Sequence, residues 1–285
     1  MTNHILTKDT PMPLGSVSKQ FCATAILLLR DQGKLKLEDT LSKYFSEYEI
    51  GKDITLKDLL SMRSGISDMV NDGTVKEASQ DKSEEENTKA IKEWIFSQDL
   101  AFEPNSEMSY SNSNYFLLSN IVEIVSGQRY VDFISENIFQ PLGMKNTGSI
   151  EEIKDSPEWA KGINIDSVQD AKIKGLTKGS GDLASTAKDM DVWMSGLKSG
   201  KIISLETYQE MITNYSPESE SAYGYGLMPE IYGGVGHTGG IEPYISFNYI
   251  DEEHGYNLFI VSNNITPYKL DELLNKLCVG IIHQH

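Results

Sequence analysis

Apolar residues recur at helical spacing through the first two thirds of the chain. The clearest pattern runs from Ser16 to Asp31 and contains the sequence FCATAILLL. Polar Ser16 near its start and Gly33 after its end are typical of helix termini. Three further patterns predict helices with the sequences AIKEWIF, YFLLSNIVEIVSG and VDFISENIF. The last of these three is expected to end at Pro141.

Two more helices are predicted by their first residues. Thr55 opens a short helix, LKDLLSMRSG, which Gly65 is expected to stop. Thr186 with Asp189 three residues later has the spacing of a helix N-cap, and the helix that follows contains DVWMSGL. Residues 68–88 are polar and acidic without a period, which indicates an exposed loop.

The last third of the chain has a different pattern. YGYGLMPEIYGG, GVGHTGG and YISFNYIDEEHGYNLFIVSNN read as strands separated by turns, and KLDELLNKLCVGII predicts a closing helix. Strands that follow one another through short turns favour antiparallel pairing. With helices before and after them, the pattern predicts an α+β fold with an antiparallel sheet flanked by helices.

Composition narrows the class of protein. The chain has 285 residues and a formal net charge of −17, which argues against binding to the phosphate backbone of a nucleic acid. Its apolar runs are too short for a transmembrane segment. Composition thus argues against a nucleic-acid partner and a membrane-spanning segment, and it leaves a small-molecule or peptide substrate open.

The cysteine count and the N-terminus bear on the compartment. Cys22 and Cys278 cannot form a disulfide framework, and Cys22 lies within an apolar helix pattern, where it is expected to be a core residue. MTNHILTKD has no basic start followed by an apolar core. The sequence as given is compatible with the cytoplasm, and with export or the cell envelope if a signal segment was removed.

Two common kinds of site are not supported. GVGHTG fits the dinucleotide fingerprint, but the fingerprint needs a following helix, and IEPYISFNYI follows instead. Five scattered histidines and the absence of paired cysteines give no metal-ligand pattern. We therefore expect neither a cofactor nor a metal.

Nucleophilic chemistry is the better candidate. Ser16 and Lys19 are three residues apart on a predicted helix, so the amine lies within reach of the hydroxyl and can favour its ionisation. This spacing alone is weak, because it recurs three times, at Ser79/Lys82, Ser185/Lys188 and Ser195/Lys198. The surroundings must separate a nucleophile from a coincidence.

Two later motifs supply those surroundings. In the sequence YSN, Tyr110 can handle protons if cations stabilise its phenolate, and Asn112 can bind a substrate amide. In the sequence HTGG, small residues of a strand allow a substrate to lie along the backbone. The backbone N–H groups of Ser16 and Gly240 can then form an oxyanion hole.

The three motifs and their order resemble the serine β-lactamase-like family, which includes class C β-lactamases, DD-peptidases, D-aminopeptidases and related esterases. LLSMRSGI, YSNSNYFLLSNIVEIVSG, IFQPLGMKNT, GDLASTAKDM, YGYGL and GHTGG also resemble family segments in family order, over roughly residues 7–270. The resemblance implies one β-lactamase/transpeptidase-like domain over residues 1–285. Its helical subdomain is expected at roughly 38–180, and its sheet-containing part at 1–37 plus 181–285.

The resemblance also assigns roles. It implies that Ser16 is the nucleophile of an acyl-enzyme and that Lys19 and Tyr110 handle its proton. Substrate would be bound by Asn112 and by the strand residues His237, Thr238 and Gly239. The oxyanion hole would be formed by the backbone N–H groups of Ser16 and Gly240. The function implied is hydrolysis of an amide or ester in a D-amino-acid peptide, a cell-wall fragment, a small ester or a β-lactam.

Two departures from the family pattern leave an alternative open. His237 stands where penicillin-recognising members carry lysine, and a histidine is mostly neutral at pH 7. Only fifteen residues precede Ser16, too few for the strands and helix that usually come first. We therefore expect the N-terminal strands to be missing, and an uncovered sheet edge would favour self-association into a homo-oligomer. The alternative function is a penicillin- or cell-wall-binding module that keeps the pocket without turnover.

Overall fold

The structure is a computed structural model that describes residues 5–70, 72, 82–162, 175–216, 219, 221–264, 276 and 280. Helices dominate the first part of the described chain, and strands gather near its end. In chain order, with η for a 3-10 or π-helical turn, the elements are β1 Met12–Pro13, η1 Gly15–Ser18, α1 Lys19–Asp31, η2 Leu41–Lys43, η3 Glu49–Asp53, α2 Leu56–Leu60, α4 Glu84–Ser97, α5 Asn112–Ser126, α6 Tyr130–Ile134, η4 Ser135–Phe139, α7 Gln140–Leu142, β2 Gly148–Ser149, α8 Ile150–Ile153, β3 Leu183–Ser185, α9 Ala187–Lys198, α10 Leu205–Met211, β4 Met228–Ile231, β5 Gly234–Ile241, β6 Tyr244–Ile250 and β7 Asn257–Ser262.

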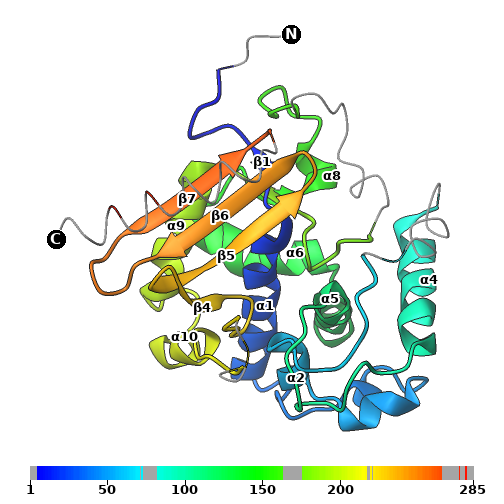
Figure 1. Ribbon diagram of the computed structural model, residues 1–285. Helices are drawn as coiled ribbons and strands as arrows, with labels where there is room; N and C mark the ends of the chain where they lie inside the picture. The colour runs from blue at the N-terminus through cyan, green and yellow to red at the C-terminus, as the bar shows by residue number, and fades with distance from the viewer. Residues whose placement is uncertain are drawn as a thin grey trace.

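The main sheet of the described residues has the strand order β4-β5-β6-β7, and every neighbouring pair is antiparallel. A smaller sheet has the order β1-β3-β2, so the segment just before η1 is hydrogen-bonded to β3. Figure 1 shows the main sheet on one side of α1, with α5, α2 and α4 on the other side. The predicted α+β class with an antiparallel sheet flanked by helices is confirmed.

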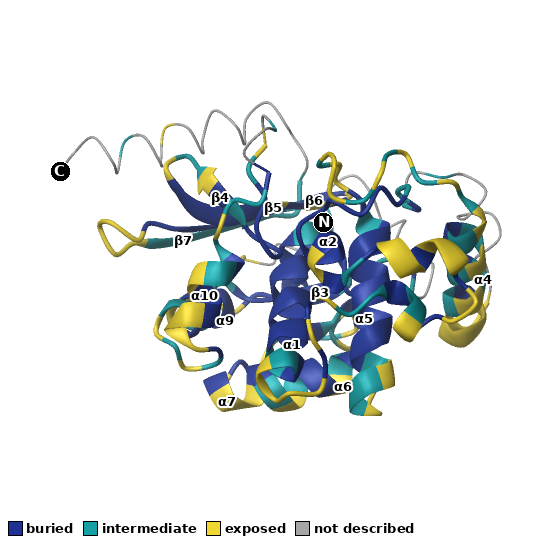
Figure 2. Ribbon diagram, turned by 90° about the horizontal axis from the view of Figure 1, so that it is seen from below, coloured by how far each residue is buried: buried dark blue, intermediate teal, exposed yellow. Residues whose placement is uncertain are grey.

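Helix α1 is the centre of the packing. It contacts α5 and α6, and the turn η1 that precedes it contacts β5 and β6. Because α1 has neighbours on several sides, it is apolar around most of its circumference, and Figure 2 shows both α1 and α5 as largely buried. The Phe21 ring lies 4.3 Å from the Trp193 ring, centroid to centroid, which joins α1 to α9.

A buried polar network fixes α1 against the sheet. The Gln20 Nε2 donates to Asn248 Oδ1 on β6 at 2.6 Å, and the Trp193 Nε1 of α9 donates to Gln20 Oε1 at 3.0 Å. The three side chains are buried, so hydrogen-bond partners are needed to offset the cost of removing their polar atoms from water. The network holds helix and sheet in one register and therefore fixes where η1 lies.

Most predicted elements are confirmed, with shifted ends. η1 and α1 together cover the helix predicted from Ser16 to Asp31. The Thr55 capping box forms, but α2 ends at Leu60, short of Gly65. The Thr186 hydroxyl accepts from the Asp189 N–H at 3.1 Å and caps α9 as predicted.

Three expectations differ from the structure. Helix α4 begins at Glu84 behind a Ser83 cap, so the end of the predicted loop 68–88 is helical. Helix α5 begins at Asn112, three residues before the start of the predicted helix YFLLSNIVEIVSG. The segment with the sequence LAS, for which the sequence pattern predicted no strand, forms β3 and pairs with β1 and β2.

Some expectations lie outside the described residues or remain untested. The predicted closing helix, KLDELLNKLCVGII, falls almost wholly outside them, as does Cys278. The division into a helical subdomain and a sheet-containing part stays a prediction. Within the described residues, β4 and β7 are the edges of the main sheet.

Gly239 lets η1 approach the sheet. A Cβ at this position would overlap the carbonyl oxygen of Leu14 and the hydroxyl of Ser246, and that hydroxyl donates to the same carbonyl at 2.6 Å. We predict that Gly239→Ala lowers the free energy of unfolding by about 1–3 kcal/mol, because rigid backbone must move to admit the methyl group.

The matched control is Gly240→Ala, since a Cβ at Gly240 meets nothing within 4 Å. Its free energy of unfolding should stay within about 0.5 kcal/mol of the original value. Urea unfolding followed by circular dichroism measures both variants. Equal losses of stability in the two would contradict the close-approach role of Gly239.

Candidate active site

Ser16 lies in the turn η1, directly before α1 and against the sheet. Gly15 has a φ of +51°, a left-handed conformation that favours glycine, and a Cβ there would come within 2.7 Å of the Gly240 backbone nitrogen. The close approach of these two backbones puts Ser16 beside the glycine end of β5. Ser16 is partly exposed, whereas Ser18 in the same turn is fully buried.

Lys19 is the first residue of α1 and is fully buried. Its Nζ donates to three oxygens: Ser16 Oγ at 3.2 Å, Asn112 Oδ1 at 2.7 Å and the Ser180 carbonyl at 2.7 Å. An ammonium has three donors, so this geometry satisfies all of them. The predicted approach of Lys19 to Ser16 is therefore present in the structure.

Burial changes the acidity of this amine. Removal from water lowers the pKa of Lys19 from 10.5 to about 7, although the nearby charges of Asp68 and Asp182 act in the opposite direction. A lysine with a pKa near 7 is present in substantial amounts as a neutral amine at neutral pH. A neutral amine within hydrogen-bonding distance of a serine hydroxyl can accept its proton.

Tyr110 lies in the loop that leads into α5, and its ring faces the Lys19 amine. The Lys19 Nζ is 4.8 Å from the ring centroid. The residue is 36% exposed, but burial of its hydroxyl raises the pKa of Tyr110 above its usual range, while hydrogen bonding to the Ser16 side chain lowers it. In the resting protein the phenol is thus protonated, so the condition for a stable phenolate is not met.

Asn112 connects Lys19 to a residue that the sequence did not mark. As the first residue of α5, it accepts from Lys19 through Oδ1, and its Nδ2 donates to Asp68 Oδ2 at 3.1 Å. Its backbone N–H donates to Asp68 Oδ1, also at 3.1 Å. Asp68 thus holds both the side chain of Asn112 and the start of α5.

The strand β5 contributes residues that alternate between two faces. Thr238 and Gly240 are exposed, whereas His237 and Gly239 are buried. His237 Nε2 and the Tyr223 hydroxyl form a hydrogen bond of 3.1 Å. Burial, followed by the charge of Lys19, lowers the pKa of His237 to about 3, so the ring is neutral near pH 7. Direct contact of His237 with a substrate stays a prediction.

A small cavity of about 70 Å³ lies at Ser16. Its lining comes from η1, the start of α5, the loop before β3 and the end of β5, and consists of Gly15, Ser16, Val70, Asn112, Thr177, Ser180, Gly181, Gly240 and Ile241. Together with Val70 from the loop after α2, five chain segments that are far apart in sequence therefore meet around the Ser16 side chain. Of the residues predicted for the site, Ser16, Asn112 and Gly240 line this cavity, whereas Lys19, Tyr110, His237, Thr238 and Gly239 do not.

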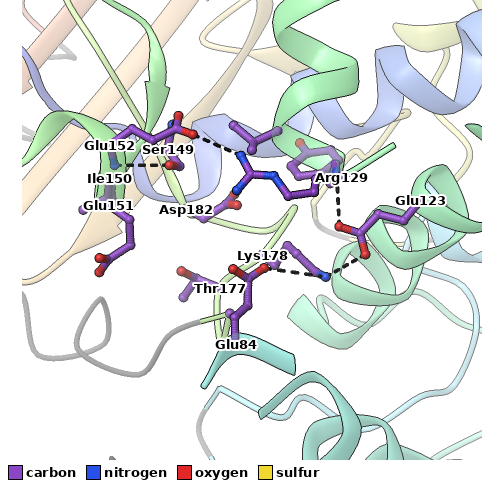
Figure 3. Close-up of a pocket in the computed structure, with 13 residues that line it drawn as sticks. Glu84, Glu123, Arg129, Ser149, Ile150, Glu151, Glu152, Thr177, Lys178 and Asp182 are labelled. Atoms are coloured by element: carbon purple, nitrogen blue, oxygen red, sulfur yellow. Dashed lines mark hydrogen bonds and ion pairs between the residues drawn. The ribbon is translucent and has the colours of Figure 1, made fainter. Parts of the chain in front are cut away.

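A second cavity, of about 140 Å³, shares Thr177 with the first and is drawn in Figure 3. Lys178 lies in it between Glu123 and Glu84, with Nζ to oxygen distances of 2.9 and 3.9 Å. Asp182 accepts a hydrogen bond from the Gly179 N–H at 3.0 Å, and burial raises its pKa to about 7. The ion pairs hold the loop whose Ser180 carbonyl binds Lys19.

The sequence analysis missed three residues that shape the site. Asp68 was included in a polar loop, and the family-like segment LLSMRSGI ends just before it. Ser180 acts through its backbone carbonyl, which carries no sequence signal, and Tyr223 is one of several tyrosines in the run YGYGL and its surroundings. Only the chain's three-dimensional course brings these groups to Lys19 and His237.

In the described part of the chain, no group of three or more His, Cys, Asp or Glu side chains is arranged to hold a metal ion. None of the helices described is both long enough and apolar enough to cross a membrane.

Comparison with known proteins identifies the family. The family model described as Beta-lactamase matches residues 2–277. The chain is 31% identical to the putative penicillin-binding protein PbpX of Bacillus subtilis over 275 residues, which is 94% of this chain and 66% of that protein. It is 25% identical to Protein flp of Staphylococcus aureus, covering 95% of this chain and 57% of that protein. The chain thus spans between half and two thirds of these relatives, and it belongs to the β-lactamase family.

Solved structures agree with this assignment. The D-amino acid amidase of Ochrobactrum anthropi SV3 superposes with a TM-score of 0.82 at 26% identity, covering 98% of this chain and 89% of that one. The octameric penicillin-binding protein homologue of Pyrococcus abyssi gives a TM-score of 0.78 at 26% identity, covering 96% and 67%. The β-lactamase/transpeptidase-like fold expected from the sequence is confirmed.

Proposed function

We propose that the protein is a serine hydrolase that acts through an acyl-enzyme, with Ser16 as the nucleophile. The observation that carries the proposal is the 3.2 Å contact between Lys19 Nζ and Ser16 Oγ, together with a burial that lowers the pKa of that lysine to about 7. A serine hydroxyl is a weak nucleophile until a neighbouring base takes its proton. A buried, partly neutral amine at hydrogen-bonding distance meets that need.

The proton path follows from the two pKa shifts. Neutral Lys19 accepts the Ser16 proton as Oγ forms a bond to the substrate carbonyl carbon. The protonated phenol of Tyr110, which interacts with Ser16, then donates its proton to the leaving nitrogen or oxygen, and Lys19 returns a proton to Tyr110. Water, deprotonated by the same pair, releases the acyl group and restores the Ser16 hydroxyl.

Negative charge develops on the carbonyl oxygen during attack. In this proposal the backbone N–H groups of Ser16 and Gly240 bind that oxygen. Support comes from the small cavity that both residues line and from the close approach of the Gly15 and Gly240 backbones. Preorganised donors in such a position are often the largest single contribution to acyl-transfer catalysis.

The proposed substrates are amides or esters whose leaving side is uncharged. His237 is neutral and buried at the position where penicillin-recognising members of the family carry a lysine. A neutral imidazole does not attract a carboxylate as an ammonium does. The likeness to a D-amino acid amidase makes D-amino-acid amides the first substrates to test, and the small cavity at Ser16 favours a small acyl group.

A binding module that acylates without turnover is the second candidate. It is favoured by the name of one relative, a putative penicillin-binding protein.

Self-association of the protein is also proposed, because a solved relative is octameric. The edge of the sheet through which it would occur stays a prediction.

We predict that Ser16→Ala abolishes acylation and lowers hydrolysis by at least about 1,000-fold, because the variant lacks the attacking oxygen. Intact-protein mass spectrometry after incubation with a D-amino-acid amide, a small ester and a penicillin measures the acyl adduct and its lifetime. A long-lived adduct without turnover would favour the binding module over the hydrolase.

The matched control is Ser195→Ala, since Ser195 has the same spacing to a lysine but lies exposed on α9, where it accepts a hydrogen bond from Asn257. This variant should keep full activity. Undiminished hydrolysis by Ser16→Ala, or an adduct mapped by peptide analysis to another residue, would refute the assignment of the nucleophile.

We also predict that kcat/KM for a non-ionising ester rises with pH and levels off above about 7. The sign follows from the base: Lys19 must be neutral to accept the proton, and burial lowers its pKa to about 7, so activity falls about tenfold per unit below that value. Rate measurements between pH 5 and 9 test this. A profile that climbs towards pH 10 would mean that the lysine keeps its ordinary pKa and is not the base.

A further inference from the structure

Asp68 is the acceptor for two different donors of Asn112. Its Oδ1 accepts from the Asn112 backbone N–H at 3.1 Å and from the Val70 N–H at 3.2 Å, and its Oδ2 accepts from Asn112 Nδ2 at 3.1 Å. The carboxylate comes from the loop after α2, whereas Asn112 begins α5. Negative charge is stabilised at such a helix start by the helix dipole.

These contacts decide which way the Asn112 amide faces. A carboxylate can only accept hydrogen bonds, so the nitrogen end of the amide must point to Asp68. The oxygen end is then left for Lys19 Nζ, which it meets at 2.7 Å. The second hydrogen of the same Nδ2 remains for the cavity at Ser16, which Asn112 lines. One carboxylate thus sets an acceptor for the lysine and a donor for a substrate.

Few groups around Lys19 other than Asp68 carry a charge that can stabilise its ammonium. Among the titratable groups near its amine, burial raises the pKa values of the Cys22 thiol and of the Tyr115 and Tyr110 phenols, and lowers that of His237, so all four are neutral near pH 7. Asp182 is the other acidic group acting on the amine, and burial raises its pKa to about 7. Asp68 contributes the largest stabilising charge to the Lys19 ammonium.

We propose that Asp68 is a positioning residue for hydrolysis: it holds the Asn112 amide with its oxygen toward Lys19 and its nitrogen toward the substrate, and so aligns the base beside Ser16. The inference rests on the proposed function. Asp68 itself does not line the cavity at Ser16, so it acts through Asn112 and Lys19 rather than on the substrate.

The variant that tests the proposal is Asp68→Asn. Its side chain keeps the size of aspartate, but its Nδ2 faces the Asn112 Nδ2, and two donors cannot bond to each other. Rotation of the Asn112 amide relieves this conflict but turns a donor toward Lys19. We expect kcat/KM at pH 8 to fall about 10–100-fold through misalignment of the base. The loss should lie partly in KM, because the donor for the substrate also moves.

The pH profile separates positioning from a merely structural role. Removal of the negative charge lowers the pKa of Lys19, so the acid limb of kcat/KM should move to lower pH by about one unit. The matched control is Asp191→Asn, because Asp191 is an exposed aspartate on α9. This variant should change neither the acid limb of the pH profile nor the value of kcat/KM at pH 8. A lower melting temperature with an unmoved limb would overturn the proposal.

The reciprocal double variant, Asp68→Asn with Asn112→Asp, restores an acceptor for Lys19 and a donor–acceptor pair between the two positions. It should return the acid limb to at least its original pH, although the substrate donor is lost and KM stays high. An acid limb that remains shifted in the double variant would argue against control through the Asn112 amide.

A crystal structure of Asp68→Asn gives a readout that needs no activity. The distance from Lys19 Nζ to the nearest Asn112 side-chain atom should lengthen from 2.7 Å to more than about 3.5 Å, beyond hydrogen-bonding range. An unchanged contact would refute the positioning role. If the original protein shows no Ser16-dependent acylation, the proposed function fails, whereas this distance still decides whether Asp68 holds the amide.

Discussion

The buried amine of Lys19 is the constraint on which the rest of the site depends. An ammonium removed from water is strongly destabilised unless acceptors surround it or it loses its proton. Both conditions apply to Lys19: three oxygens from three separate segments accept hydrogen bonds from its Nζ, and burial lowers its pKa to about 7. Asn112, Ser180 and Ser16 must therefore be held together by the fold, and that same convergence builds the cavity at Ser16.

The second constraint is the close approach of the turn η1 to the strand β5. Gly15 and Gly239 lack the Cβ atoms that would block it, and the network of Gln20, Asn248 and Trp193 holds α1 in register with the sheet. Ser16 thereby lies close to the exposed Gly240, and both residues line the cavity at Ser16. The neutral His237 is turned to Tyr223, so this wall of the site offers little attraction to an anion. This geometry and charge are the basis for proposing a small, uncharged amide or ester as the substrate.

The sequence predicted the fold class, the late antiparallel strands and the convergence of Ser16, Lys19 and Asn112, because motif order and periodicity are local signals. It could not predict Asp68, which looked like one more charge in an acidic loop, or the carbonyl of Ser180, since backbone groups have no residue type. Nor could it predict whether cations lower the pKa of Tyr110, because the raised pKa depends on burial, which arises only from tertiary packing.

Direct titration of Lys19 tests the central claim most closely. Protein carrying ¹³C at lysine Cε, with the Lys19 signal assigned by its loss in Lys19→Arg, reports the ionisation of this one amine by NMR. The account predicts a midpoint near pH 7, far below the ordinary 10.5. A Lys19 signal that stays fully protonated up to pH 9 would contradict it, because the amine would then be unable to accept a proton from Ser16 near neutral pH.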